Sequence, residues 1–352
     1  MKIPTWKMLL LIVLISSGCN KPSPLPDSRV HAFYYPWYGT TEWDGEPRHW
    51  AHDQMGDVKN RVSYTGAENI GADFYPVGGC YSSNDPVVLA RHMKQLRQAG
   101  IGSLCVSWWG AGSYEDAALD KLFQAASEAG IKVSLHLEPL PGRDAEVCRQ
   151  ELAGFLSRFG EHEALYRDPA SGRPLVFVYD SYLSTVEQWQ RLLKSTGDQS
   201  IRETEIDCLM VGLWVEESHG EDLYEAGFDG LYSYFATDGF TFGSSTENWP
   251  QMAEFAREKE MLFVPCVGPG YADLRIRPWN TNNQRERGNG LYYQRMAAAA
   301  LALKPPLIGM TSFNEWHEGT QIEPAQPAEI EDFKYLDYGS VGLEGYLEMT
   351  LK

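Results

Sequence analysis

The stretch Pro306-Leu-Ile-Gly-Met-Thr-Ser-Phe-Asn-Glu-Trp-His-Glu-Gly-Thr-Gln321 contains the pattern that decides the fold. Its first part, Pro306 to Met310, is a short apolar run that is typical of a buried β-strand. The five residues from Asn314 to Glu318 then bring two carboxylates, an imidazole, an indole and an amide. A strand that only supports the fold is normally followed by turn formers, so this polar cluster indicates a strand end that carries chemistry. A charged strand exit with one solvated glutamate and one ion pair is the alternative at this point.

The same pattern of an apolar run followed by polar residues recurs along the chain. Apolar runs typical of strands cover residues 30–37, 103–109, 132–138, 174–180, 208–215, 230–235, 261–267 and 307–314. Between them, apolar residues at three- and four-residue spacing predict helices at 86–99, 116–129, 144–159, 185–194, 221–226, 248–259, 291–303 and 343–351. Glycine closes several of these helices, as expected of a C-terminal cap.

Eight strands that alternate with eight helices predict an α/β fold, the (β/α)8 or TIM barrel, as a single domain with long βα loops over residues 29–352. An open doubly wound sheet is the second choice. It is disfavoured because neither G-x-G-x-x-G nor G-x-x-x-x-G-K-[ST] follows any of the predicted strands. In a barrel, the carboxyl ends of all strands lie on one face, which is where barrel enzymes place their active sites.

Polar and aromatic side chains collect after the predicted strands, which fits such a site. Two carboxylates beside flat aromatic rings suit a sugar, because the rings stack on C–H faces while acids and amides act on hydroxyls and the glycosidic oxygen. A metal site of His49, His52 and Glu138 is a weaker candidate, since no H-x-x-x-H or H-E-x-x-H pattern occurs. Serine hydrolase chemistry is disfavoured because G-x-S-x-G does not occur.

The charge balance argues against nucleic acid as a partner. The 352 residues carry 48 acidic and 30 basic side chains, for a net charge of −18, which repels a phosphate backbone. Beyond Cys19 the cysteines are Cys80, Cys105, Cys148, Cys208 and Cys266, an odd number without metal-ligand spacing. Three of them, Cys105, Cys208 and Cys266, lie in apolar strand-like runs, so we expect buried thiols, and a single disulfide is the alternative. We expect no metal and no cofactor, and a monomer.

The first residues predict export. A short basic lead and an apolar run from Met8 to Ile15, too short to span a bilayer, end in small residues before Cys19. This resembles a bacterial lipoprotein signal, although Ser16 stands where a larger aliphatic residue is usual. Residues 1–18 would then be the signal peptide, Cys19 the lipidated residue and 19–28 a tether, with the protein anchored to the outer membrane on its surface or periplasmic side. Membrane contact would be through that anchor alone. An ordinary secretory signal is the alternative.

Several motifs together resemble glycoside hydrolase family 99, the endo-α-mannosidases and endo-α-1,2-mannanases, from about residue 30 to the C-terminus. They are His31-Ala-Phe-Tyr-Tyr-Pro-Trp-Tyr-Gly39, Gly71-Ala-Asp-Phe-Tyr-Pro76, Tyr179-Asp-Ser-Tyr182, Gly227-Phe-Asp-Gly-Leu-Tyr-Ser-Tyr-Phe-Ala-Thr237, Val267-Gly-Pro-Gly-Tyr271, Ile276-Arg-Pro-Trp-Asn280 and Thr311-Ser-Phe-Asn-Glu-Trp-His-Glu-Gly-Thr-Gln-Ile-Glu323. The resemblance implies a (β/α)8 barrel without a metal, and endo-acting hydrolysis of a mannan or mannose-rich glycan with retention of configuration.

The resemblance also implies the roles of the two glutamates. Glu315 would deprotonate the sugar's own 2-hydroxyl, which attacks the anomeric carbon to give a 1,2-anhydro sugar. Glu318 would protonate the leaving oxygen and then activate the water that opens the epoxide. This requires an ionised Glu315 beside a Glu318 with a raised pKa, and their three-residue separation requires a turn between them.

The remaining site residues are expected to bind substrate: Tyr35, His49, Trp50, Trp109, His136, Glu138, Tyr232, Tyr234, Arg277, Trp279, Asn280, Asn314 and His317. For several of them a structural role stays open. His136 and Glu138 share one strand face and would also fit a polar layer inside the barrel, the two tyrosines 232 and 234 would fit packing, and Arg277 a loop ion pair.

Trp109 bears on specificity, because the vertebrate endomannosidases of the family have tyrosine at this position and the bacterial mannanases have tryptophan. Its ring would lie against the sugar of the −2 subsite and favour mannose over glucose. Mannanase is therefore the first prediction. An endomannosidase that releases a glucosyl-mannose unit is the second, and a non-catalytic surface glycan-binding protein is the alternative of a different class.

Overall fold

The computed structural model describes residues 25–55 and 69–351 of the chain. The predicted signal peptide and Cys19 lie outside the described residues. Among the helices that the structure does describe, none is long and apolar enough to cross a membrane.

Parallel strands form the central sheet, in the order β8-β7-β6-β5-β4-β3-β1-β10-β9. They are β1 (Asp27–Tyr34), β3 (Ile101–Trp108), β4 (Lys132–Leu137), β5 (Leu175–Val178), β6 (Leu209–Leu213), β7 (Gly230–Tyr232), β8 (Leu262–Val264), β9 (Cys266–Val267) and β10 (Ile308–Met310). The first and last strands of the chain are neighbours, because Ala32 of β1 pairs with Met310 on one side and with Leu104 of β3 on the other.

The sheet closes into a barrel through one interrupted strand. β8 and β9 stand at opposite ends of the sheet order, yet only Pro265 separates them in the sequence. Proline has no N–H for the ladder, so the strand breaks there, while the Pro265 carbonyl still accepts a hydrogen bond from Gly309 N at 3.0 Å. The nine strands thus occupy eight positions, and the predicted (β/α)8 barrel is confirmed.

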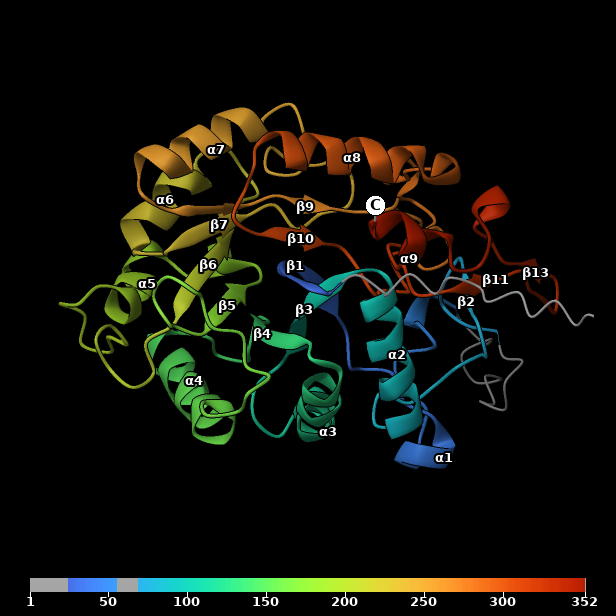
Figure 1. The fold of residues 1–352 in the computed structure, drawn as a ribbon, viewed down its shortest axis with the longest axis horizontal. Helices are drawn as coiled ribbons and strands as arrows, with labels where there is room; N and C mark the ends of the chain where they lie inside the picture. Colours follow the sequence, from blue (N-terminus) through green and yellow to red (C-terminus); the bar gives the residue numbers. More distant parts are fainter. Residues whose placement is uncertain (1–24, 56–68, 352) are drawn as a thin grey trace, which may run out of the picture.

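Helices cover the outside of the barrel (Figure 1). In chain order they are α2 (Pro86–Gln98), α3 (Tyr114–Ala129), α4 (Ala145–Phe159), α5 (Val186–Leu193), α6 (His219–Ala226), α7 (Trp249–Glu258), α8 (Leu291–Ala302) and α9 (Gly345–Thr350). Side chains cap the starts of four of them, namely Asp85, Ser113, Asp144 and Thr185. Such caps satisfy backbone N–H groups that a helix start leaves free.

Short strands from the segment that precedes α2 and from the segment after β10 lie together at one side of the barrel, where Figure 1 labels β2, β11 and β13. Here β2 (Tyr75–Pro76) pairs antiparallel with β11 (Ala325–Gln326), near the hairpin of β12 (Glu329–Ile330) and β13 (Phe333–Lys334). A short helix, α1 (Thr41–Asp44), also lies in the first segment. The sequence analysis predicted only long loops at these places.

The strands are shorter at their ends than predicted. The predicted strand 230–235 ends at Tyr232 and the predicted strand 307–314 ends at Met310. The residues beyond these ends no longer pair with the neighbouring strands. Many of them are still buried, so the apolar pattern of the sequence continues past the end of the sheet. Among the described residues, Cys105, Cys148, Cys208 and Cys266 are buried free thiols, as expected.

Candidate active site

The segment that follows β10 turns sharply, as the spacing of its two glutamates requires. Ser312 Oγ accepts a hydrogen bond from Glu315 N at 2.8 Å, and Gly319 N donates to Trp316 O at 3.1 Å. Gly319 has φ 60°, and a Cβ there would lie 2.5 Å from the carbonyl oxygen of Ala272. Only glycine fits this position, so the turn that carries Glu315 and Glu318 depends on it.

A buried carboxylate anchors this turn from below. Glu323 accepts hydrogen bonds from Trp316 Nε1 at 3.0 Å and Tyr81 OH at 2.7 Å, and it pairs with His92 Nε2 at 2.9 Å. Burial acts to raise the pKa of Glu323, but the surrounding donors, first of all His92, lower it below its usual value. The turn therefore rests on an ionised, fully paired group.

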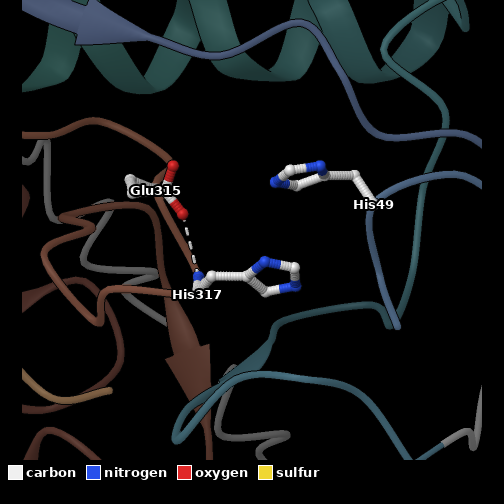
Figure 2. Close-up of side chains that lie close together, drawn as sticks. All are labelled: His49, Glu315 and His317. Carbon is white, nitrogen blue, oxygen red and sulfur yellow. Dashed lines mark hydrogen bonds between the residues drawn. The ribbon is translucent and has the colours of Figure 1, made fainter. Parts of the chain in front are cut away.

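Glu315 lies at the bottom of the site with 4% of its surface exposed. Its Oε1 accepts a hydrogen bond from His317 N at 3.0 Å, drawn as the dashed line in Figure 2. Burial and the nearby charge of Glu318 raise the pKa of Glu315 well above its ordinary value, because a desolvated carboxylate next to a like charge is poorly stabilised.

Glu318 is more open, with 25% of its side chain exposed. Burial raises its pKa, while the Arg277 guanidinium, whose Nη1 lies 3.4 Å from Oε1, opposes the rise. The sequence predicted a raised pKa for Glu318 beside an ionised Glu315. In this structure burial raises the pKa of both carboxyls, and that of Glu315 well above its ordinary value, which is opposite to the expectation of an ionised Glu315.

Two histidines stack beside Glu315. His49 lies between Trp37 and His317, with ring centroids 4.0 and 4.6 Å away, and Figure 2 shows its ring above that of His317. Burial lowers the pKa of His49 to about 3 and that of His317 well below its usual value, so both rings are neutral at physiological pH.

Donor atoms of His49, Glu315 and His317 lie within 4.8 Å of one another, near enough to suggest a metal site. This set differs from the weaker candidate of the sequence analysis, which combined His49 with His52 and Glu138. The two rings are inclined by only 22°, and imidazole lone pairs lie in the ring plane. In stacked rings these lone pairs point in parallel planes and do not converge on one point. The arrangement therefore fits side-chain packing better than metal coordination.

A polar layer fills the barrel just below the two glutamates. Ser107 Oγ donates to Glu138 Oε1 at 2.7 Å, and His136 Nδ1 lies 3.2 Å from the same oxygen. Tyr35 and Tyr234 share a hydrogen bond through their hydroxyls. Burial raises the pKa of Tyr35, helped by the charges of Glu138 and Glu315, which places this layer within electrostatic reach of the pair.

Three of the predicted substrate-binding residues have packing roles instead. Trp50, Tyr232 and Asn314 have 0% of their surface exposed. Trp50 Nε1 donates to Tyr81 O at 2.9 Å, Tyr232 OH bonds His136 Nε2 at 3.0 Å, and the Asn314 amide bonds both backbone groups of Tyr35. All three side chains are buried and engaged with protein partners, so their direct contact with a sugar stays a prediction.

Exposed side chains surround the mouth as predicted from the loops. Trp109, at the end of β3, is 38% exposed, and Trp279 is 67% exposed. Asn280 donates Nδ2 to Asp273 Oδ2 at 2.9 Å, so its amide is engaged within its own loop. The sequence analysis missed Asp273, a buried acid that nothing in its local pattern distinguishes from a solvated loop aspartate.

A (β/α)8 barrel that carries two neighbouring buried carboxyl groups after its last strand, together with exposed indole rings, indicates the class of glycoside hydrolases. The chain belongs to glycosyl hydrolase family 99, whose family model matches residues 25–352.

Several named proteins are similar to this chain over most of its length. The glycoprotein endo-alpha-1,2-mannosidase of Rattus norvegicus is 42% identical over 92% of this chain and 73% of its own length. The glycoprotein endo-alpha-1,2-mannosidase-like protein of Homo sapiens is 42% identical over 94% of this chain and 76% of its own. The solved structure of the GH99 endo-alpha-mannosidase from Bacteroides thetaiotaomicron superposes with a TM-score of 0.86, at 40% identity over 93% of this chain and 96% of that one.

Proposed function

We propose that this protein hydrolyses internal α-mannosidic bonds of α-1,2-branched mannan or related mannose-rich glycans, with retention of configuration. Family membership and relatives at 40–43% identity support endo-acting cleavage of α-mannosidic bonds. The observation that carries the proposal is the pair Glu315 and Glu318, two neighbouring carboxyl groups whose pKa values are raised by burial, on the glycine-dependent turn after β10.

In the proposed mechanism the substrate supplies the nucleophile. Glu315 takes the proton of the sugar's 2-hydroxyl while that oxygen attacks the anomeric carbon, and Glu318 gives its proton to the departing glycosidic oxygen. The product is a 1,2-anhydro sugar. Glu318 then removes a proton from water, which attacks the anomeric carbon, and Glu315 returns its proton to the 2-oxygen. Two inversions give net retention, and both carboxyl groups end as they began.

The electrostatics of the pair support a division of labour. Like charges in one buried site resist double ionisation, which favours a state in which the two carboxyls share one proton. One proton on two carboxyls is what a base and an acid working together require. A singly protonated pair therefore fits the first step without a second titrating group.

Trp109 supports mannan ahead of glucosylated N-glycans. Its indole is 38% exposed beside the mouth, where it offers an apolar face to a sugar of the −2 subsite. The test is a digestion panel that compares α-1,2-branched, α-1,6-backbone mannan with glucosylated high-mannose glycan, with the anomer of the first product read by NMR. Faster release from the glucosylated glycan would favour the endomannosidase alternative. Binding without any cleavage would favour a glycan-binding protein.

We also propose export and anchoring through Cys19, and a monomeric state. The basic and apolar residues before Cys19 support the anchor. Replacement of this cysteine by alanine should move the protein from the membrane fraction to the soluble fraction and abolish labelling by a fatty acid. Protease treatment of intact cells that carry the wild-type protein would distinguish surface from periplasmic exposure. Analytical ultracentrifugation of the purified protein would test whether it is a monomer.

A further inference from the structure

Asp273 is a buried carboxylate in the loop that follows β9. Its side chain is 0% exposed, and four other side chains donate hydrogen bonds to it. Oδ2 accepts from Tyr271 OH at 2.9 Å, Arg277 Nη1 at 3.0 Å and Asn280 Nδ2 at 2.9 Å, and Oδ1 accepts from Gln284 Nε2 at 2.7 Å. A buried charge is tolerated when it is this well paired, so the carboxylate organises the whole loop around itself.

The loop that Asp273 organises contacts Glu318 at several points. Arg277 Nη1 lies 3.4 Å from Glu318 Oε1 as well as 3.2 Å from Tyr271 OH. The backbone N–H of Ala272 donates to the Glu318 carbonyl at 2.9 Å. Asp273 follows Ala272 in the sequence and binds Arg277. It therefore fixes both the position of the Arg277 guanidinium and the distance from this loop to the turn that carries Glu318.

Two carboxylates compete for one guanidinium nitrogen here. Arg277 Nη1 is closer to Asp273, at 3.0 Å, than to Glu318, at 3.4 Å. Without that competitor, the guanidinium would be free to form a close, two-pronged pair with Glu318, the geometry that arginine and carboxylate prefer. Such a pair would stabilise the ionised form of Glu318 and remove the proton that an acid must donate.

We propose that Asp273 is a positioning residue for the candidate acid: it holds Arg277 at a fixed distance from Glu318, so that this carboxyl can carry and deliver a proton. Asp273 itself does not contact the reacting atoms. The part of the inference that concerns proton delivery rests on the proposed function, and the part that concerns the geometry of the loop does not.

The test of proton delivery compares leaving groups in the variant Asp273→Asn. On mannan, whose leaving oxygen needs a proton, we expect kcat to fall about 10- to 100-fold, because small displacements of a catalytic group cost rates of this order. On an α-glycosyl fluoride, whose leaving group needs no proton, we expect a loss below about threefold. An equal loss on both substrates, or no loss on either, would overturn the role.

A double-mutant cycle tests whether the effect passes through the arginine. In an Arg277→Met background, Asp273→Asn should lower kcat on mannan by no more than about threefold, because the group that it positions is gone. Fully additive losses would refute action through Arg277. The matched control is Asp168→Asn, which removes a half-buried aspartate that bonds Ser171 Oγ at 2.7 Å before β5, at the other end of the barrel, and should leave both rates unchanged.

Amide hydrogen exchange tests the geometry without any substrate. Asp273→Asn should speed amide exchange in residues 271–285, including the Ala272 amide that donates to the Glu318 carbonyl. Exchange in the barrel strands should stay unchanged. Unchanged exchange in this loop would overturn the inference whatever the enzyme's activity. If the wild-type protein fails to cleave mannan while the loop loosens in the variant, the proposed function fails and the positioning of Arg277 by Asp273 stands.

Discussion

Arg277 allows a quantitative prediction, because its charge acts on both carboxyls of the candidate pair. It lowers the pKa of Glu318, and also that of Glu315, against the effect of burial. At the observed 3.4 Å, two unit charges attract by about 1 kcal/mol in water and about 5 kcal/mol at an effective dielectric constant of 20. Because the Arg277 side chain is 36% exposed and is shared with Asp273, the lower end applies, about 1–2 kcal/mol or about one pKa unit.

The perturbation is Arg277→Met, which replaces the guanidinium with a shorter, uncharged apolar side chain. In the proposed mechanism the acid limb of kcat/KM reports ionisation of Glu315 and the basic limb reports loss of the Glu318 proton. Loss of a positive neighbour raises both pKa values, so both limbs should move to higher pH, and the basic limb, which reports Glu318, should move by about one unit. Arg277→Lys, measured in parallel, keeps the charge and should move them by less than half as much. Limbs that stay in place, or move to lower pH, would refute the electrostatic reasoning.

Three further predictions concern the turn, specificity and stability. Glu318→Gln should lower kcat/KM on mannan by about 10²- to 10⁴-fold and spare a fluoride leaving group, whereas Glu315→Gln should lose both; hydrolysis assays on the two substrates separate these outcomes. Trp109→Tyr should lower the mannan to glucosylated-glycan rate ratio severalfold in the digestion panel, and an unchanged ratio would contradict the subsite assignment. Glu323→Ala should cost about 3–5 kcal/mol in urea unfolding at pH 7, because it leaves a buried partner unpaired, while exposed Asp198→Ala should cost under about 0.5 kcal/mol. Since the folded-state pKa of Glu323 is lowered, its contribution should be present above pH 5 and decline as the pH falls through and below the ordinary glutamate range.

The barrel could be predicted from the sequence because its signals are local. Each strand is a short apolar run, and each helix has its own period and caps, as at Ser113 and Asp144. The break at Pro265 and the early end of the strand at Tyr232 were missed, since an apolar pattern does not reveal where a strand leaves the ladder.

The candidate site was only partly predictable, because burial depends on contacts distant in sequence. Trp50 and Asn314 have the composition of sugar-binding residues, yet each is covered by partners more than 30 positions away, Tyr81 for one and Tyr35 for the other. Asp273 is the converse case. Its short-range partners are ordinary loop residues, and only the fold shows that they enclose it beside Glu318.

The raised pKa of Glu315 explains how the pair would change its protonation when substrate binds. In this structure Glu315 is the more deeply buried of the two, and Glu318 is held toward its ionised form by Arg277. A sugar 2-hydroxyl that donates to Glu315 would stabilise its carboxylate and lower its pKa, while a glycan that covers the exposed quarter of the Glu318 side chain would raise that of Glu318. Bound substrate would thereby shift a proton shared by the pair toward the proposed acid. The pH profile of kcat reports the substrate-bound enzyme, whereas that of kcat/KM reports the free enzyme. The kcat profile should therefore be broader, with its acid limb at lower pH and its basic limb at higher pH. Two coincident profiles would mean that substrate binding does not redistribute the proton between the two carboxyls.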